Sequence, residues 1–308
     1  MKSAARLREL LRAPEVLVAP GAYDALSARI IERLGFSAVY LSGAGVTGAF
    51  LGMTDVGLIT MTELVQVARN VALAVGVPVI CDSDTGFGNA LNTRRTVREF
   101  ERAGIAGIHV EDQVWPKRCG HFEGKGVIHV EEMAQKIRAA CEARENPDFV
   151  VIARSDAIAV EGFEATLARG EAYLAAGADM FFVDGPRNME QVEGIAARFG
   201  QRIPLLINMA ETGKTPYLPA GELGRLGYKV VIYPATARLA AVKAVTHVLQ
   251  ELKRTGSTAG VKDRMITFAE WTELTGLPEA TALERRYGTD DSRLPGFTSG
   301  EFEPPGSR

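Results

Sequence analysis

The stretch VPVICDSDTGFGNALNTRRTVREFERAGIAGIHVE, residues 77–111, contains two apolar runs on either side of a helical pattern. The runs at 77–82 and 107–111 are short and rich in apolar and β-branched residues, which is typical of buried strands. Between them, TRRTVREFERAG has the mixed polar and apolar spacing of a helix that covers a sheet. The stretch therefore predicts a strand–helix–strand unit with parallel strands.

The same alternation continues in both directions along the chain. Eight strands separated by helices in roughly 250 residues favour an α/β fold, a closed (β/α)8 TIM barrel. The alternative is a doubly wound open sheet, but the first strand here is followed by APGAYDALSARI, which lacks the GxGxxG phosphate turn. The predicted strands are 16–20, 38–42, 77–82, 107–111, 149–153, 180–184, 204–208 and 230–234.

The alternation ends after residue 256, where GSTAG indicates a hinge. We predict a catalytic barrel over residues 1–256 and a C-terminal helical extension with a mobile tail over 257–308. Within the extension, DRMITFAEWTELTGLPEATALERRYG predicts two short helices joined by a turn.

The composition is that of an ordinary globular protein, with 46% hydrophobic and 24% charged residues. A net charge of -3 without long blocks of one sign argues against nucleic-acid and membrane partners. The chain shows neither a signal-peptide pattern nor an apolar run of the ~20 residues that span a bilayer. Cys81, Cys119 and Cys141 have unrelated spacings, so we expect reduced thiols and a cytoplasmic protein.

Polar side chains directly follow several predicted strands, where TIM barrels place their active sites. Helix capping can explain some of the Asp, Ser and Asn residues there, but not Glu111 and Arg154. Arg154 suits a substrate carboxylate, because a guanidinium binds a carboxylate through paired hydrogen bonds. The alternative is a buried ion pair of Arg154 with Glu111 or Asp184.

The segment CDSDTGFGN carries Asp82 and Asp84 and predicts a metal site. Strand alternation would aim both carboxylates to the same side, where they repel each other unless one is protonated or a cation intervenes. Oxygen ligands without His or Cys favour Mg2+. Glu111 and Asp112 could complete the shell directly or through water. The alternative is an Asx-turn that ends the strand.

The loop WPKRCGHFEGKG, residues 115–126, holds Cys119 near Lys117, Arg118 and His121. Such cationic neighbours favour a thiolate or an easily tuned thiol. The glycines of the loop would allow it to move and close over a ligand. The alternative is a surface loop with an incidental cysteine.

Together these motifs resemble the isocitrate lyase / phosphoenolpyruvate mutase superfamily, from the N-terminal helix to about Gly288. KRCGH at 117–121 is similar to the signature of the lyase branch. Further similar motifs occur in the expected order: YLSGAG at 40–45, GMTDVG at 52–57, DSDTGFGN at 82–89, VEDQ at 110–113, ARSDA at 153–157 and NMAETGKTP at 208–216.

The resemblance implies a Mg2+ site, with Mn2+ as the alternative ion, held by Asp82 and Asp84 with Asp55 and Glu111 in the outer shell. It implies that a small di- or tricarboxylate is the substrate. The implied substrate-binding residues are Ser42, Gly43 and Ala44 for the oxyacid carboxylate, Asn208, Thr215 and Pro216 for the second carboxylate, and Gly120 and Asp184 beside them.

The resemblance also implies the catalytic roles. Tyr40 would be the base, with a pKa depressed by Arg154, and Cys119 would protonate the departing enediolate. Lys117, His121 and Glu111 complete the implied catalytic set. The family exchanges its C-terminal helices between subunits and forms tetramers, so a homotetramer is expected.

The implied activity is cleavage of a C–C bond in a 2-hydroxy dicarboxylate or tricarboxylate, of methylisocitrate or 2-alkylmalate type. Cys119 argues against the mutases proper, the oxaloacetate decarboxylases and the phosphonopyruvate hydrolases. The carboxyphosphonoenolpyruvate mutase type carries KRCGH too and remains an alternative. VDGP at 183–186, with Asp184, resembles alkylmalate and dimethylmalate lyases or oxaloacetate-cleaving relatives rather than methylisocitrate lyases.

Overall fold

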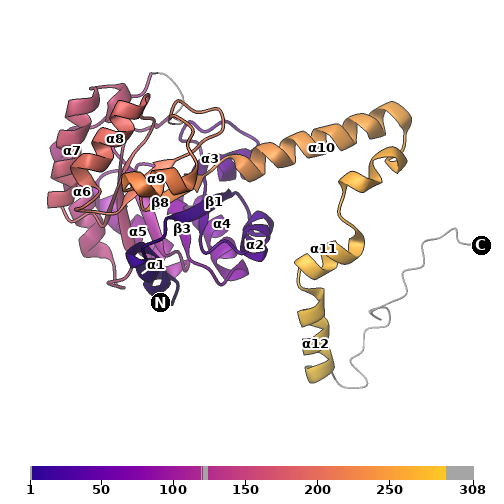
Figure 1. Cartoon of the computed structure of the whole chain (residues 1–308). Helices are drawn as coiled ribbons and strands as arrows, with labels where there is room; N and C mark the ends of the chain where they lie inside the picture. Colours follow the sequence, from indigo (N-terminus) through magenta and orange to yellow (C-terminus); the bar gives the residue numbers. More distant parts are fainter. Residues whose placement is uncertain (1, 119, 121–123, 289–308) are drawn as a thin grey trace, which may run out of the picture. The chain divides into compact units, whose positions relative to one another are not determined.

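The computed structural model describes residues 2–118, 120 and 124–288. Eight parallel strands close into a barrel in their sequence order, with helices packed around it (Figure 1). The predicted (β/α)8 barrel is confirmed, and each predicted run overlaps one strand, although β1 and β5 extend two residues further than predicted. The strands are β1 (Leu17–Ala22), β2 (Val39–Leu41), β3 (Val79–Asp82), β4 (Gly107–Glu111), β5 (Val150–Ser155), β6 (Met180–Val183), β7 (Leu205–Asn208) and β8 (Val230–Tyr233).

Several helices begin at a residue whose side chain caps the first turn. Asn89 accepts from the backbone N–H groups of Leu91 and Asn92, and Thr60 forms a reciprocal capping box with Glu63. The helices are α1 (Lys2–Arg12), α2 (Ala25–Arg33), α3 (Gly43–Val46), α4 (Met61–Ala74), α5 (Ala90–Arg102), α6 (Val130–Ala143), α7 (Phe163–Ala175), α8 (Met189–Phe199), α9 (Ala220–Leu226), α10 (Thr236–Thr255), α11 (Phe268–Leu274) and α12 (Leu277–Tyr287), with short η1 (Thr47–Leu51), η2 (Ala157–Ala159) and η3 (Ala259–Arg264).

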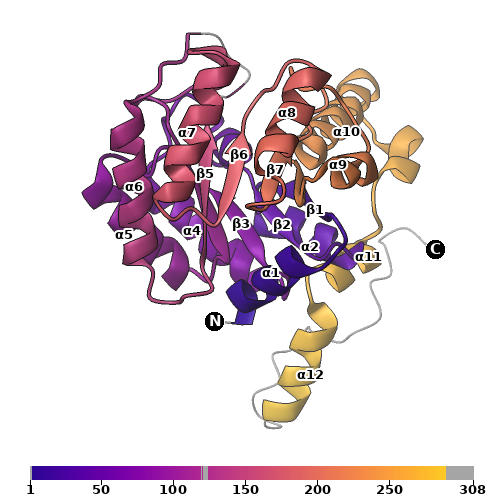
Figure 2. The same cartoon turned by 60° about the vertical axis from the view of Figure 1, so that its left-hand side comes forward.

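Alternate residues of each strand face two separate cores, because successive side chains of a strand point to opposite sides. The inner core fills the barrel and includes Tyr40, Ile80 and Phe182. Leu7 of α1 joins this inner core, so α1 closes the end of the barrel at which the strands begin (Figure 2). The outer core lies between the strands and the surrounding helices. The strands are therefore apolar on both faces, apart from the ends described below.

The chain divides into two compact units, residues 1–243 and the residues from Ala244 onward. The first holds the barrel. The second contains α11 and α12, the two short helices predicted from the sequence. The division at residues 256 and 257 stays a prediction. Within the described residues, every helix is too short or too polar to cross a membrane.

Gly170 of α7 is expected to tolerate no side chain, because a Cβ there would lie 2.6 Å from Phe199 and 2.7 Å from Phe181. Gly170→Ala should lower the free energy of unfolding by about 1–3 kcal/mol through overpacking. Gly221→Ala in α9 is the control, since nothing lies within 4 Å of its added Cβ. That control should be neutral or stabilising by up to about 1 kcal/mol. Urea unfolding checks both, and similar losses in the two variants would contradict the packing argument.

Candidate active site

The carboxyl ends of neighbouring strands bring polar side chains together inside the barrel. Tyr40 of β2, Asp82 of β3, Glu111 of β4 and Arg154 of β5 are all buried. The sheet register pairs Glu111 directly with Arg154 across β4 and β5. Both therefore project inward at the same level of the barrel, as their positions after apolar runs indicated.

Arg154 is buried among three carboxylates. Its Nε and Nη2 donate to the two oxygens of Asp156 at 2.8 and 3.1 Å, and Nη2 also donates to Asp184 at 2.9 Å. Its Nη1 lies 3.2 Å from Glu111. Burial opposes the charge, but these carboxylates raise the pKa of Arg154 well above its usual value. The ion pairs considered as the alternative to substrate binding are thus present.

Lys117 forms a second buried cluster beside the first. Its Nζ lies 2.6 Å from Asp55 and 2.9 Å from Asp84, and only 2% of its side chain is exposed. Burial alone would favour the neutral amine, but Asp84, Glu111, Asp82 and Asp55 together raise the pKa of Lys117 well above its usual value. Lys117 is therefore an ammonium ion inside the site.

Asp82 and Asp84 are brought together by a turn rather than by strand alternation. β3 ends at Asp82, and Asp84 has a positive φ of 48°. The backbone N–H of Asp84 donates to Asp82 Oδ1 at 2.9 Å, which is the Asx-turn considered as the alternative. Strand alternation is therefore not the reason that the two carboxylates lie close together, because the strand is already over. Both carboxylates are nevertheless buried and near Lys117.

Negative charge is in excess around this site. Both oxygens of Asp84 and of Glu111, and Oδ1 of Asp55, are buried without a hydrogen-bond partner, although ion pairs with Lys117 and Arg154 lie nearby. Burial raises the pKa of Asp84 to about 7 and that of Glu111 well above its usual range. The carboxyl groups of the region are Asp55, Asp82, Asp84, Glu111, Asp156 and Asp184, and its cations are Lys117, Lys125 and Arg154.

These carboxyl groups fit a hard divalent cation, because carboxylate oxygens are the ligands that Mg2+ prefers and several of them here lack a hydrogen-bond partner. Among the described residues, no three Asp, Glu, His or Cys side chains converge as direct ligands of one ion. A Mg2+ ion bound there would therefore keep several waters, as it usually does when one or two carboxylates hold it.

Tyr40 lies deeper in the barrel than the carboxylates. Its hydroxyl is 2.8 Å from Nε2 of His109, and the two rings stack with centroids 5.9 Å apart. Burial and the nearby Asp82 raise the pKa of Tyr40 well above its usual value, and Arg154 only partly opposes them. Arg154 thus acts in the expected direction on the pKa of Tyr40, but burial and Asp82 outweigh it.

The segment after β2 that is expected to bind the oxyacid carboxylate, residues 42–44, lies close to Asp82. Ser42 caps α3 by accepting from the Gly45 N–H at 3.1 Å. A Cβ on Gly43 would lie 2.7 Å from Asp82 Oδ2, so the backbone approaches the carboxylate as only glycine permits. Ala44 is half-buried in the same turn of helix.

The predicted second-carboxylate side is built around Asp184. Asn208 Nδ2 donates to Asp184 Oδ1 at 3.2 Å, and the Oδ1 of Asn208 itself is buried without a partner. A Cβ on Gly120 would lie only 1.6 Å from Asp184 Oδ2. Thr215 is buried and Pro216 half-buried in the connection between β7 and α9.

The loop with the cysteine signature is described only in part, and Cys119 and His121 lie outside the described residues. Gln113 holds the first half, accepting from the Arg118 N–H at 2.9 Å and donating to the Arg118 carbonyl at 2.8 Å. Lys125 holds the second half, donating to Asp156 and to the Gly120 carbonyl. A cavity of about 750 Å3 is lined by residues from this loop and by Val56 and Leu58.

Asp112 does not belong to the metal shell, contrary to the expectation. It follows Glu111 and points to the opposite side, where it accepts from Ser155 Oγ at 2.7 Å, Tyr173 OH at 2.8 Å and the Asp156 N–H at 2.8 Å. Because successive residues of a strand point to opposite sides, the inward position of Glu111 would have predicted that Asp112 points outward. Lys125 was also missed, although it lies in the signature loop.

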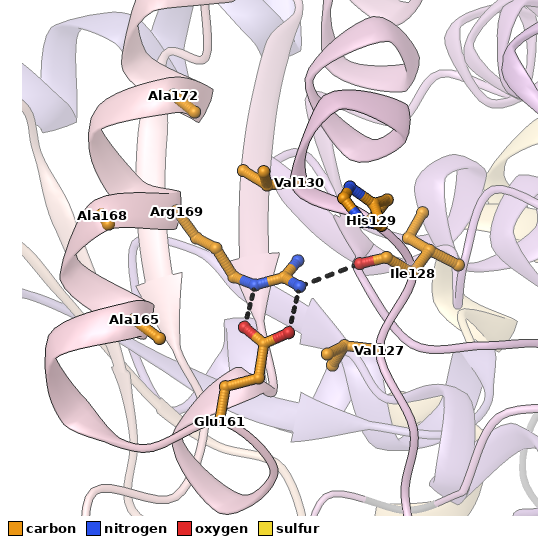
Figure 3. Close-up of a pocket in the computed structure, with 9 residues that line it drawn as sticks. All are labelled: Val127, Ile128, His129, Val130, Glu161, Ala165, Ala168, Arg169 and Ala172. Carbon is orange, nitrogen blue, oxygen red and sulfur yellow. Dashed lines mark hydrogen bonds and ion pairs between the residues drawn. The ribbon is translucent and has the colours of Figure 1, made fainter.

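Outside the barrel, Arg169 extends the Asp112 network to the surface. It donates to Tyr173 OH at 3.1 Å, to both oxygens of Glu161 and to the Ile128 carbonyl at 2.9 Å. Figure 3 shows the guanidinium between Glu161 and the segment that precedes α6. The groove there has a volume of about 410 Å3 and is lined largely by Val and Ala side chains.

Comparison with known families agrees with this geometry. A family profile described as Phosphoenolpyruvate phosphomutase matches residues 7–253. The chain belongs to the PEP mutase/isocitrate lyase superfamily. The resemblance drawn from the motifs is thereby confirmed.

Two curated members of this superfamily are similar over nearly the whole chain. The 2,3-dimethylmalate lyase of Eubacterium barkeri is 48% identical, covering 94% of this chain and 99% of the relative. The 2-methylisocitrate lyase of Aeropyrum pernix is 46% identical, covering 88% of this chain and 86% of the relative. The expected enzyme class, a carbon–carbon lyase, is confirmed.

A solved structure of phosphonopyruvate hydrolase, in complex with oxalate and Mg++, superposes with a TM-score of 0.85 at 32% identity. The likeness covers 93% of this chain and 99% of that one. A superfamily member with the same barrel thus binds this ion together with a small dicarboxylate.

Asp112→Asn should destabilise the barrel by about 2–4 kcal/mol, because the new amide N–H2 would face donors that now have a buried carboxylate as acceptor. Tyr173→Phe is the matched control and removes one of those donors, which should cost only about 1 kcal/mol. Thermal and urea unfolding measure both. An Asp112→Asn loss no larger than the control would contradict the role given to this network.

Proposed function

We propose that this protein is a Mg2+-dependent lyase that cleaves a 2-hydroxy dicarboxylate or tricarboxylate into an α-keto acid and a second carboxylate. The substrate is of 2-alkylmalate or methylisocitrate type. The observation that carries the proposal is the cluster of buried carboxyl groups beside Lys117 and Arg154, in which Asp84 Oδ2 and Glu111 Oε1 lack a hydrogen-bond partner. The 48% identity to a dimethylmalate lyase and 46% to a methylisocitrate lyase support it.

Asp82 and Asp84 would hold the ion directly or through water, with Asp55 and Glu111 around them. Mn2+ is the alternative ion. When bound, the ion supplies positive charge that stabilises the oxyacid end of the substrate and the negative charge that develops in cleavage. Lys117 lies 2.6 Å from Asp55 and 2.9 Å from Asp84, so its positive charge partly opposes the effect of burial on the pKa of Asp84.

The chain's own residues bind and orient the substrate. Ser42, Gly43 and Ala44 offer backbone and hydroxyl groups to the oxyacid carboxylate. Arg154 faces the same space, and one of its Nη1 protons is available beyond the ion pair with Glu111.

The second carboxylate is assigned to the opposite side of the site. Asn208, Thr215 and Pro216 line that side, with Gly120 and Asp184 next to them. The buried, unpartnered Oδ1 of Asn208 is an acceptor for a substrate group there.

Proton transfer falls to Tyr40, Cys119 and their neighbours. Tyr40 is the proposed base for the substrate hydroxyl, and its own hydroxyl is held by His109. Burial lowers the pKa of His109 to about 4, so the imidazole is neutral and its Nε2 shares a hydrogen bond with the Tyr40 hydroxyl. Cys119 is the proposed acid for the enediolate, assisted by Lys117, His121 and Glu111.

A phosphonomutase of the carboxyphosphonoenolpyruvate type is the second candidate. It is favoured by the 42% identity, over 92% of this chain, to the chloroplastic carboxyvinyl-carboxyphosphonate phosphorylmutase of Arabidopsis thaliana. An oxaloacetate-cleaving activity is the third, since Asp184 takes the place of a longer carboxylate. These activities differ in substrate, so one panel of substrates separates them.

Assembly and location also belong to the proposal. The second unit exposes Ile266, Phe268, Trp271 and Tyr287 to solvent, with exposed fractions of 57, 73, 42 and 69%. Apolar area of this kind commonly marks a protein interface. We propose that these helices pack on another copy of the chain, in a cytoplasmic homotetramer.

A substrate panel tests the reaction. Methylisocitrate, isocitrate, dimethylmalate, citramalate and oxaloacetate are supplied with Mg2+ and then with excess chelator, and keto-acid release is followed. We expect a C–C cleavage in the dimethylmalate or methylisocitrate class that falls at least about 100-fold on chelation. Activity that survives chelation would remove the metal from the proposal. Phosphonate formation, seen by phosphorus NMR, would favour the mutase instead.

Cys119→Ala should lower kcat by at least about 100-fold, because a positioned proton donor contributes about that much. Oxalate should still bind in the presence of Mg2+, as calorimetry can measure, because the strand-end residues remain. Cys141→Ala is the control, since this thiol lies on α6 and donates to the Gly177 carbonyl at 3.1 Å. Undiminished turnover in Cys119→Ala would exclude the thiol as the acid.

A further inference from the structure

Lys125 connects two parts of the site that are far apart in the sequence. Its Nζ donates to Asp156 Oδ1 at 2.9 Å and to the Gly120 carbonyl at 2.7 Å. Only 3% of its side chain is exposed. A buried ammonium with one carboxylate and one carbonyl partner is a fixed contact rather than a surface ion pair, because both partners are shielded from water.

Asp156 is the anchor of this contact. Its carboxylate accepts a fork of two hydrogen bonds from Arg154, one on Oδ2 at 2.8 Å and one on Oδ1 at 3.1 Å, and Oδ1 also accepts from Lys125. Its backbone N–H donates to Asp112 at 2.8 Å. Burial opposes ionisation, but Arg154 and Lys125 hold the pKa of Asp156 at about 2. The carboxylate is therefore ionised and held from two sides.

Gly120 is the other end of the contact. An added Cβ would lie 1.6 Å from Asp184 Oδ2 and 2.9 Å from Arg154 Nη2, so the Gly120 backbone lies directly against that ion pair. The hydrogen bond from Lys125 to the Gly120 carbonyl keeps the peptide in this place. The Lys125 ammonium thus links Gly120 to Arg154: it binds the Gly120 carbonyl directly, and it binds Asp156, which in turn binds Arg154.

We propose that Lys125 is a positioning residue, which fixes the Gly120 peptide and the Arg154–Asp156 fork as one unit against the substrate. This rests on the proposed function, since it assigns Arg154 and Gly120 to the substrate. Lys125 need not touch the substrate itself. Its loss leaves Asp156 with Arg154 alone and leaves the Gly120 carbonyl without its donor. Both changes shift groups next to the reacting molecule, whereas the strand-end carboxylates stay in place.

Three variants test the proposal on the full-length protein with Mg2+. Lys125→Met should lower kcat about 100-fold, the cost of a misplacement of about 1 Å, while KM changes less than about 3-fold. Lys125→Arg, which keeps the charge and the donors, should recover most of the loss. Lys229→Met is the matched control, because Lys229 also donates to two carbonyls, those of Ala13 and Glu15, near the opposite end of the barrel. It should lower the melting temperature and leave kcat unchanged.

Hydrogen exchange gives a readout that does not need turnover. Amides of peptides that span residues 113–128 should exchange faster in Lys125→Met than in the wild type, and not in Lys229→Met. If the wild-type protein turns over no member of the panel, the proposed function fails, and the exchange experiment still decides on Lys125. Unchanged exchange, or an unchanged kcat in an active enzyme, would overturn the positioning role.

A double-variant cycle separates positioning from a simple loss of stability. If Lys125 acts through Asp156, then Lys125→Met adds less than about 3-fold to the kcat loss of Asp156→Asn, because coupled residues are not additive. Independent, multiplicative losses would overturn the route through Asp156.

Discussion

A guanidinium removed from water requires carboxylates around it, since an unpaired buried charge costs several kcal/mol. Arg154 meets this requirement through Glu111, Asp156 and Asp184, which come from the ends of β4, β5 and β6. The three strands must therefore end at one level, and the register that pairs Glu111 with Arg154 achieves this. Asn208 and Lys125 each donate to one of these three carboxylates, and the Gly120 backbone lies against Asp184 and Arg154.

The barrel itself could be predicted from the sequence because each strand is a short apolar run that is buried on both faces. That pattern depends on local residues alone. The positions of Glu111 and Arg154 followed from the same rule, since both continue a strand. Asp84 did not follow it, because the chain turns at Asp82 and gives Asp84 a left-handed conformation.

The remaining contacts depend on groups that are distant in the sequence. Asp112 is held by Tyr173 of α7, 61 residues away, and nothing in VEDQ indicates that partner. The pKa of Tyr40 depends on its complete burial and on the nearby Asp82, which together outweigh Arg154, and composition does not reveal that balance. Lys125 stands in the loop that attracted attention, but its partner Asp156 lies 31 residues further on. Sequence spacing can reveal a contact only when both of its residues belong to the same helix, strand or loop.

The inner core limits the path by which a ligand can reach the candidate site. Leu7 of α1 blocks the axis at one end, and the stacked rings of Tyr40 and His109, with Phe182 against them, block it halfway. The barrel is therefore a cup and not a tube. A ligand that binds at the carboxyl ends of the strands therefore enters and leaves over the same rim.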